Sequence, residues 1–190
     1  NNLTLANSGS LPAFDGGGIL NQGILFLQNV TFSNHLVPFS SSGAGLLNLG
    51  GTVQIIGCTF KNNEALSGGA IANLANGILG VFNSTFSGNR ATSTSPGSGK
   101  GGAIWNQSGS VTLINSTLVE NQTANSAAGG GIANESEQTF TLINTLLAGN
   151  TAISLAHNCA GTLSEDGHHL DTGTSCGFAA TGSLNNIDAT

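Results

Sequence analysis

Positive charge is scarce in this chain of 190 residues, whose cations are Lys61, Arg90 and Lys100 and whose formal net charge is -6. Proteins that bind nucleic acid or anionic membranes do so through many Lys and Arg side chains, so the composition argues against both partners. Apolar runs are also short. None approaches the roughly 20 residues of a membrane-spanning helix, and we therefore expect no membrane insertion.

Two sequence signals are absent as well. The chain opens directly on the strand-like segment NNLTLAN, so we expect any export signal to have been removed or omitted. The Asp-x-Asp-x-Asp-Gly spacing of calcium loops does not occur. Only 6% of the residues are charged, yet we predict an ordered chain, because the 29 glycines recur at repeated positions and the apolar residues alternate.

What the sequence does contain is a repeat of 25 to 33 residues, with copies that start at Gly16, Gly43, Gly68, Gly101 and Gly129. Each copy opens with Gly and a branched aliphatic residue. It closes on Phe or Leu, followed three residues later by Asn or, in the first copy, by His. A period of this length is typical of solenoids, propellers and arrays.

Short strands fill each copy. In the middle strand apolar residues alternate with others, as in Val111-Thr112-Leu113, which places one face inward. A Gly-Gly-x-Ile strand precedes it and a strand holding Phe or Leu follows it. We predict an all-β, right-handed parallel β-helix of about six rungs, each of three short strands. We assign residues 1–158 to the repeat domain and 159–190 to a disulfide-closed loop and tail strand packed on it.

Asparagine recurs in three columns when the copies are aligned. The columns are Asn21, Asn48, Asn73, Asn106 and Asn134; Asn29, Asn83, Asn115 and Asn144, with Gly57 in the second copy; and Asn63, Asn89, Asn121 and Asn150, with His35 in the first copy. Asn tolerates left-handed turns, and stacked amides hydrogen-bond to the rungs above and below. We therefore predict that these residues build the fold rather than bind a ligand.

The GGAI motif at 68–71 and the F-x-x-N motif at 86–89 resemble the repeats of chlamydial polymorphic outer-membrane proteins. The segment CAGTLSEDGHHLDTGTSC, from Cys159 to Cys176, resembles the end of secreted bacterial right-handed β-helix proteins of the choice-of-anchor Q type. Together the resemblance covers residues 3–178. It implies a secreted or cell-surface β-helix, often adhesive or of unknown function, and leaves the mode of attachment to the cell open.

Three cysteines are present. Cys159 and Cys176 lie outside the repeats and bracket a polar, glycine-rich loop. We predict a disulfide between them, which implies an oxidising, extracytoplasmic compartment, and metal binding is the alternative. Cys58 occupies a repeat position that holds Val, Ser or Thr in the other copies, so we expect a packed thiol inside the stack.

Alternation leaves one apolar row on the outside of the predicted coil, and Trp105 also points outward if Ile104 points inward. The candidate interface residues are Ile56, Phe82, Trp105, Ile114 and Ile143. Exposed apolar stripes usually mark an interface. The alternative is that the strand bends at the corner and tucks these residues inward.

The longest insertions follow the third strand, and Lys61, Arg90 and Lys100 all fall near that corner. Insertions gathered on one face of a solenoid often mark its binding face. We therefore consider the three cations a candidate binding-loop corner for surface glycans. The alternative is that they are solvated charges on flexible loops.

Reactive groups are few, and we identify no catalytic constellation and no cofactor. Glu135 and Glu137 are close in sequence but have no partner base, so they do not match the paired carboxylates of glycosidases. One dense polar cluster comprises Glu165, Asp166, His168, His169 and Asp171. For this cluster we favour a structural clasp over a metal site or a His–Asp acid/base pair.

A row of threonines, which ice-binding solenoids use, is also incomplete. Thr31, Thr59, Thr85 and Thr117 align, but Leu146 ends the row and no second threonine row accompanies it. The signal for ice binding is therefore weak.

The two ends of the chain give the last indications. Residues Thr4 to Asn7 align with Thr112 to Asn115, which places the start of the chain in a middle strand. Either a longer protein was cut here or another subunit caps the first rung. In the second case we expect the tail from Ser183 to Ile187 to add as a strand to a neighbouring copy, and head-to-tail repetition of this contact would build a fibre.

The leading functional hypothesis is a non-enzymatic, extracellular structural or adhesive module that self-associates end to end or along the apolar stripe. The alternatives are a polysaccharide-active β-helix enzyme, either a lyase or a hydrolase, and a carbohydrate-binding module.

Overall fold

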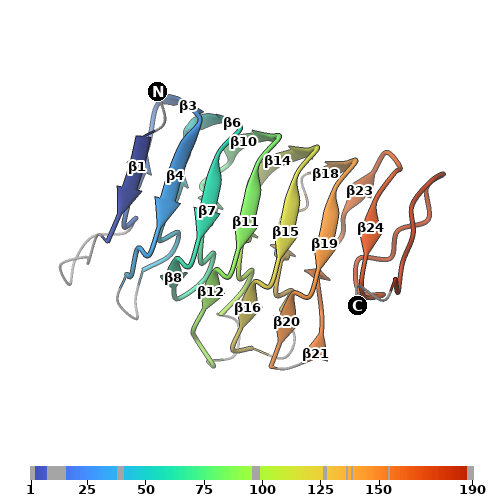
Figure 1. The fold of residues 1–190 in the computed structure, drawn as a ribbon. Helices are drawn as coiled ribbons and strands as arrows, with labels where there is room; N and C mark the ends of the chain where they lie inside the picture. Colours follow the sequence, from blue (N-terminus) through green and yellow to red (C-terminus); the bar gives the residue numbers. More distant parts are fainter. Residues whose placement is uncertain are drawn as a thin grey trace.

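The chain coils into a right-handed parallel β-helix, as Figure 1 shows. The computed structural model describes residues 3–7, 16–37, 41–95, 99–125, 128–135, 137, 139–153 and 155–187. These residues form strands, turns and loops, and none of them forms a helix that is long and apolar enough to cross a membrane.

Four sheets form the walls of the coil, and successive strands follow the order C, D and A, then B in the four middle turns. Sheet C contains β2 (Ile19–Asn21), β5 (Leu46–Leu49), β9 (Ile71–Leu74), β13 (Ile104–Asn106), β17 (Ile132–Asn134) and β22 (Cys159–Ala160). Sheet D contains β3 (Ile24–Gln28), β6 (Thr52–Ile56), β10 (Gly77–Phe82), β14 (Gly109–Ile114), β18 (Phe140–Ile143) and β23 (Ser164–Glu165). Sheet A contains β1 (Leu3–Ala6), β4 (Val30–Ser33), β7 (Thr59–Lys61), β11 (Thr85–Ser87), β15 (Thr117–Val119), β19 (Leu146–Ala148) and β24 (Leu170–Asp171). Sheet B contains β8 (Glu64–Ala65), β12 (Arg90–Ala91), β16 (Gln122–Thr123), β20 (Thr151–Ala152) and β21 (Leu155–Ala156).

Among the described residues, four turns therefore have a fourth strand, β8, β12, β16 or β20, in addition to the three predicted. The strands of sheet B are only two residues long, which is too short for a period-two pattern to reveal them. In β8 and β12 the second residue, Ala65 or Ala91, is buried, whereas Glu64 and Arg90 face outward.

In-register pairing stacks identical side chains along the core. Phe32 pairs with Phe60, and Phe60 pairs with Phe86. Their rings stack with centroids 4.6 Å and 5.0 Å apart and nearly parallel planes. All three side chains are fully buried. Burial of one such side chain stabilises the fold by about 1.5–3 kcal/mol, so this column is a main source of its stability.

Two of the three Asn columns form buried ladders of hydrogen bonds, which confirms their structural role. In the first column Asn48 Nδ2 donates to Asn73 Oδ1 at 2.7 Å and to the carbonyl of Gly51 at 2.9 Å. In the third column Asn89 Nδ2 donates to Asn121 Oδ1 at 2.9 Å and to the carbonyl of Phe60 at 3.0 Å.

The second Asn column is different, because its side chains are exposed at the turn from sheet D to sheet A. The backbone there is left-handed, with φ of 55° at Asn29, 50° at Asn83 and 62° at Gly57. Asn and Gly adopt this conformation more readily than other residues. Turn geometry therefore explains this column, and the outward side chains are available for other contacts.

The alignment of the first residues with a middle strand is wrong. β1 pairs with β4 of sheet A, where Thr4 lies opposite Thr31 and Leu5 opposite Phe32. Both strand types read as alternating Thr and apolar residues, so four residues are too few to distinguish them.

At the other end β22, β23 and β24 extend sheets C, D and A. The predicted disulfide is present: Cys159 and Cys176 are bonded, with their Cα atoms 4.9 Å apart. The tail does not extend away from the coil, because the amide of Leu184 donates to the carbonyl of His169 at 2.8 Å and Leu184 bridges Leu170. The tail thus pairs with β24 of its own chain, and the domain boundary at 158 stays a prediction.

Candidate binding groove

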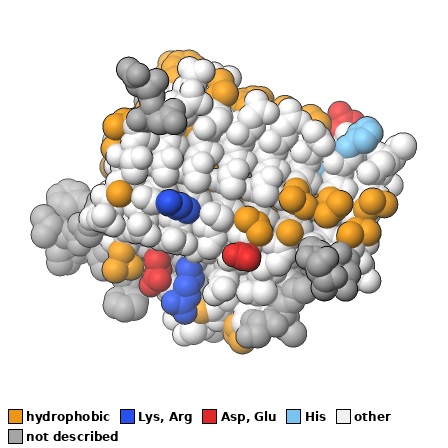
Figure 2. Space-filling view, in the orientation of Figure 1, with side chains coloured by type: hydrophobic (Ala, Val, Ile, Leu, Met, Phe, Trp, Pro, Cys, Tyr) orange, Lys and Arg blue, Asp and Glu red, His pale blue; other side chains and the backbone are white. Residues whose placement is uncertain are grey.

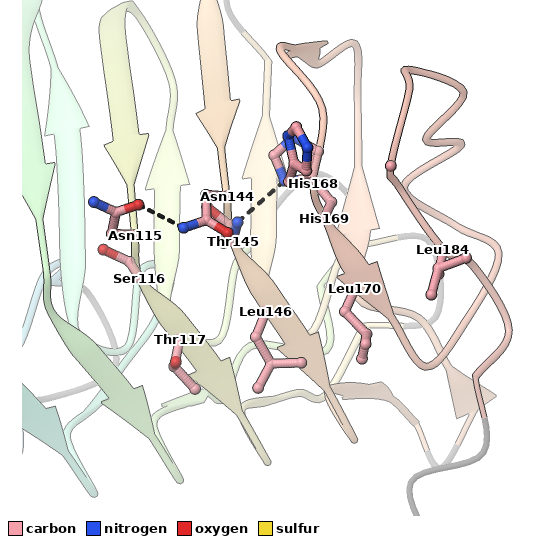
Figure 3. Close-up of a pocket in the computed structure, with 11 residues that line it drawn as sticks. Asn115, Ser116, Thr117, Asn144, Thr145, Leu146, His168, His169, Leu170 and Leu184 are labelled. Carbon is pink, nitrogen blue, oxygen red and sulfur yellow. Dashed lines mark hydrogen bonds between the residues drawn. The ribbon is translucent and has the colours of Figure 1, made fainter.

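A groove of about 460 Å³ opens near the C-terminal end of the coil, at the corner between sheets D and A. Figure 3 shows that two rows of side chains line it. One row is polar and consists of Asn115, Asn144 and His168. The other is apolar and consists of Leu146, Leu170 and Leu184.

Left-handed turns position the polar row. The φ angles are 51° at Asn115, 47° at Asn144 and 61° at His168, so His168 continues the exposed Asn column of the earlier turns. Gly182 follows it with φ of 82°. A Cβ on Gly182 would lie 2.8 Å from His168 Cδ2, so the glycine leaves the space that the imidazole occupies.

The two amides of the polar row are joined. Asn144 Nδ2 donates to Asn115 Oδ1 at 2.7 Å, as the dashed line in Figure 3 shows. An Asn amide offers two N–H donors and one acceptor oxygen. Within the described part of the chain, the Nδ2 of Asn115 and the Oδ1 of Asn144 make no further hydrogen bond. Both groups are at the exposed surface of the groove.

Sheet A supplies the apolar row. The outward threonines of this sheet end at Thr117, which lies opposite Leu146, and Leu146 lies opposite Leu170. Leu184 continues the row through its bridge to Leu170 and is 53% exposed. Hydrophobic side chains gather at this end of the face in Figure 2. The incomplete threonine row seen in the sequence is therefore replaced in register by leucines.

A column of hydroxyl and thiol groups lies beneath the turn. The amide of Cys58 donates to Ser84 Oγ at 3.1 Å, and the amide of Ser84 donates to Ser116 Oγ at 3.2 Å. Cys58 takes the same role, because its Sγ accepts from the amide of Val30 at 3.4 Å. The thiol is buried, as expected, and its burial raises its pKa.

His169 ends that column and forms part of the groove floor. Its Nδ1 accepts a hydrogen bond from the amide of Thr145 at 3.2 Å. The side chain is buried, and burial lowers its pKa despite the opposing effect of Glu165, whose Oε2 lies 4.0 Å from Nε2. His168 and His169 therefore face different surroundings, one solvent and the other the interior.

Two carboxylates of the predicted polar cluster, Glu165 and Asp171, hydrogen-bond to the chain around them, whereas Asp166 is exposed. The carboxylate of Glu165 accepts hydrogen bonds from the amides of Ala179 and Ala180 and from Ser183 Oγ. Burial alone would raise the pKa of Glu165, but these hydrogen bonds lower it overall. Asp171 is buried and accepts from the amide of Gly173 at 2.8 Å. Among the described residues, no three His, Cys, Asp or Glu side chains lie together as a metal site would need.

The predicted apolar stripe is in register on sheet D, where Ile56 pairs with Phe82 and Phe82 with Ile114. Its side chains are half-buried. The expectation that Trp105 is exposed is wrong: it is 8% exposed and packs with Leu47, Ala72 and Ala133 in a second apolar cluster. Period-two alternation assigned the correct side of the strand, but it does not indicate what covers that side.

The three cations lie on different parts of the coil. Lys61 ends β7 in sheet A, and Arg90 begins β12 in sheet B, 3.7 Å from Glu64 across an exposed ion pair. Lys100 precedes β13 and contacts Glu135. Parts of the three long insertions, at 38–40, 96–98 and 126–127, lie outside the described residues.

Glu135 and Glu137 are both exposed, and Glu135 contacts its neighbours. The Oε1 of Glu135 contacts Lys100 Nζ, and its Oε2 accepts from Trp105 Nε1 at 3.0 Å. The carboxylate thus holds the edge of the tryptophan cluster.

Sequence reasoning did not find the groove. Its amides were assigned to the fold, and the single signal for it was the change from Thr117 to Leu146.

Residues 83–107 match the Chlamydia polymorphic membrane protein repeat, a segment that includes the F-x-x-N motif of one copy and the GGAI motif of the next. No curated protein and no solved structure matches the chain. No finding confirms the choice-of-anchor Q resemblance. The chain is a parallel β-helix repeat protein with a segment similar to the repeat of Chlamydia polymorphic membrane proteins.

Proposed function

We propose that the chain is a non-enzymatic module displayed on a cell surface, where its outer face adheres to other molecules. The observation that carries the proposal is that buried and outward residues of the repeat have different roles. The shared Phe side chains and two of the three Asn columns are buried in stacks and ladders, whereas the outward row of sheet A changes from threonine to leucine at Leu146 and Leu170. A constant core with an outer row that can change suits adhesion, and the repeat match supports display at a surface.

Display at the surface is tested by labelling intact and permeabilised producing cells with an antibody against the chain. We expect equal signal from both, while a cytoplasmic control protein is labelled only after permeabilisation. Signal that requires permeabilisation would overturn the proposal. Adhesion is tested with beads that carry the purified chain, with albumin-coated beads as the control.

The absence of catalysis needs its own test. Glu135 and Glu165 are both held by hydrogen bonds to the chain itself, which supports a structural role for the strongest acid candidates. We expect no unsaturated products and no new reducing ends when the chain is incubated with a panel of polyuronates and neutral polysaccharides. Either product would favour the lyase or hydrolase alternative.

Self-association is the second part of the proposal. Ile56, Phe82 and Ile114 form a half-buried apolar row in register on sheet D. Contact between these rows of two copies would bury both. Sedimentation velocity over a hundredfold range of concentration tests it, and a monomer at every concentration would exclude it.

A further inference from the structure

The groove between sheets D and A carries a more specific inference, which rests on the proposed adhesive function. We propose that it binds a neutral saccharide. The polar row of Asn115, Asn144 and His168 follows one wall, and the leucine row follows the other, with both rows running across the same turns (Figure 3).

The polar wall matches the hydroxyl groups of a sugar. Successive turns of a β-helix lie about 4.8 Å apart, so two amides on neighbouring turns reach different hydroxyl groups of one sugar ring. The Nδ2 of Asn115 donates and the Oδ1 of Asn144 accepts, which suits a hydroxyl group in either role. Their mutual hydrogen bond of 2.7 Å holds both amides in place before a ligand arrives. Such preorganisation reduces the entropic cost of binding.

The apolar wall matches the apolar faces of a sugar ring. A pyranose ring exposes C–H groups on its faces, and these pack against aliphatic side chains such as Leu146 and Leu170. Binding sites typically combine an apolar surface with a few polar groups that fix the orientation of the ligand. A purely apolar partner would leave the exposed amides without hydrogen bonds, which is costly.

The charge of the groove selects among saccharides. The residues that line it include no Lys, Arg, Asp or Glu. Its titratable side chains are the exposed His168 and the buried His169, whose pKa burial lowers and whose Nδ1 accepts from the amide of Thr145. Acidic polysaccharides are held by cationic side chains, above all by Arg. The groove therefore suits neutral sugars rather than uronates.

The test uses an array of neutral and uronic-acid-containing oligosaccharides, followed by calorimetric titration with the strongest neutral binder. The first variant is the double substitution Asn115→Gly and Asn144→Gly, which removes both amides. Gly57 and Gly182 occupy the same left-handed position, so the fold tolerates glycine there. The second variant is Leu170→Thr, which places at this position the residue type of the earlier turns of sheet A. The control is Asn83→Gly, in the same column but outside the groove.

We expect the wild-type chain and the Asn83→Gly control to bind a neutral saccharide equally, and each groove variant to bind at least tenfold more weakly. Circular dichroism verifies that the variants are folded. Three results would overturn the inference: no neutral saccharide binding at millimolar concentration, binding of acidic saccharides alone, or binding that both groove variants retain. A dimer that Leu170→Thr abolishes would show that a second copy fills the groove, and would also overturn it.

The bead assay separates this inference from the proposed function. If beads carrying the double glycine variant still adhere as well as wild-type beads, the adhesive function stands and the saccharide site is wrong. If wild-type beads do not adhere at all, the proposed function itself fails.

Discussion

The amide of Thr145 donates to Nδ1 of His169 at 3.2 Å, in the position where earlier turns use a Ser hydroxyl or a Cys thiol. This bond requires Nδ1 to carry no proton. The buried ring is therefore neutral with its proton on Nε2, in agreement with its lowered pKa. The relationship makes the last turns of the coil sensitive to acid.

Stability is expected to decrease as the pH falls below about 6.5, the ordinary pKa of His. Burial lowers the pKa of His35 and His169 in the folded chain, so the unfolded chain binds protons more strongly. Their contribution is complete above the unfolded pKa and is lost as the pH drops. Urea unfolding between pH 8 and pH 5 measures the effect. A midpoint that is constant over this range would contradict it.

A matched variant assigns part of that pH dependence. His35 Nε2 lies 2.9 Å from the carbonyl of Leu5, as Asn63 Nδ2 lies 3.2 Å from the carbonyl of Phe32 one turn later. His35→Asn therefore extends the amide ladder by one turn. We expect this variant to fold and to lose a smaller share of its stability than wild type between pH 7 and pH 5. An unchanged pH dependence would show that His35 does not contribute to the loss of stability in acid.

Asn89→Ala is expected to destabilise the chain by about 3 kcal/mol or more, because several buried groups lose their partners. Asn89 donates to Phe60 and Asn121, and its Oδ1 accepts from Asn63 at 2.9 Å. The control is Asn83→Gly, at an exposed turn where the second copy already has glycine, and it is expected to change stability by less than about 0.5 kcal/mol. Urea unfolding compares the two. Equal costs would refute the distinction between ladder and turn asparagines.

Reduction of the disulfide is expected to loosen the clasp first. Cys159 and Cys176 are 17 residues apart, and a cross-link that closes a loop of this length stabilises a protein by about 3 kcal/mol. Amide hydrogen exchange with and without dithiothreitol measures the change. We expect faster exchange at Asp171 and Leu184, which bond β24 to the tail, and little change at Phe60. A uniform change along the whole chain would indicate a different role.

The sequence was sufficient to predict the coil, because the repeat places Phe60 over Phe32 and Asn89 over Asn63 whatever the details of the turns. It missed sheet B, whose strands are two residues long. The repeat pattern also did not predict that Trp105 is buried or that the tail pairs with β24 of its own chain. Both features depend on contacts between segments that do not repeat. The groove could not be predicted from the repeat either, because it forms where His168 and Leu170 replace the repeated residues.

Glu120 allows a test of the left-handed turn between sheets A and B. Its φ is 57°, whereas the equivalent positions of the neighbouring turns are Gly88 and Gly149, with φ of 62° and 61°. A left-handed conformation costs a residue with a Cβ roughly 1–2 kcal/mol. Replacement by glycine removes this cost, but part of the gain in stability is lost because glycine has more conformational freedom in the unfolded chain.

Glu120→Gly is therefore expected to raise the free energy of unfolding by about 0.5–1 kcal/mol. The reverse change in the next turn, Gly149→Ala, is expected to lower it by a similar amount. Both positions are exposed, so neither change disturbs the core. Urea unfolding of the two variants measures the effect. The turn geometry would be wrong if Glu120→Gly destabilised the chain, because an exposed residue in any ordinary right-handed or extended conformation loses stability on replacement by glycine.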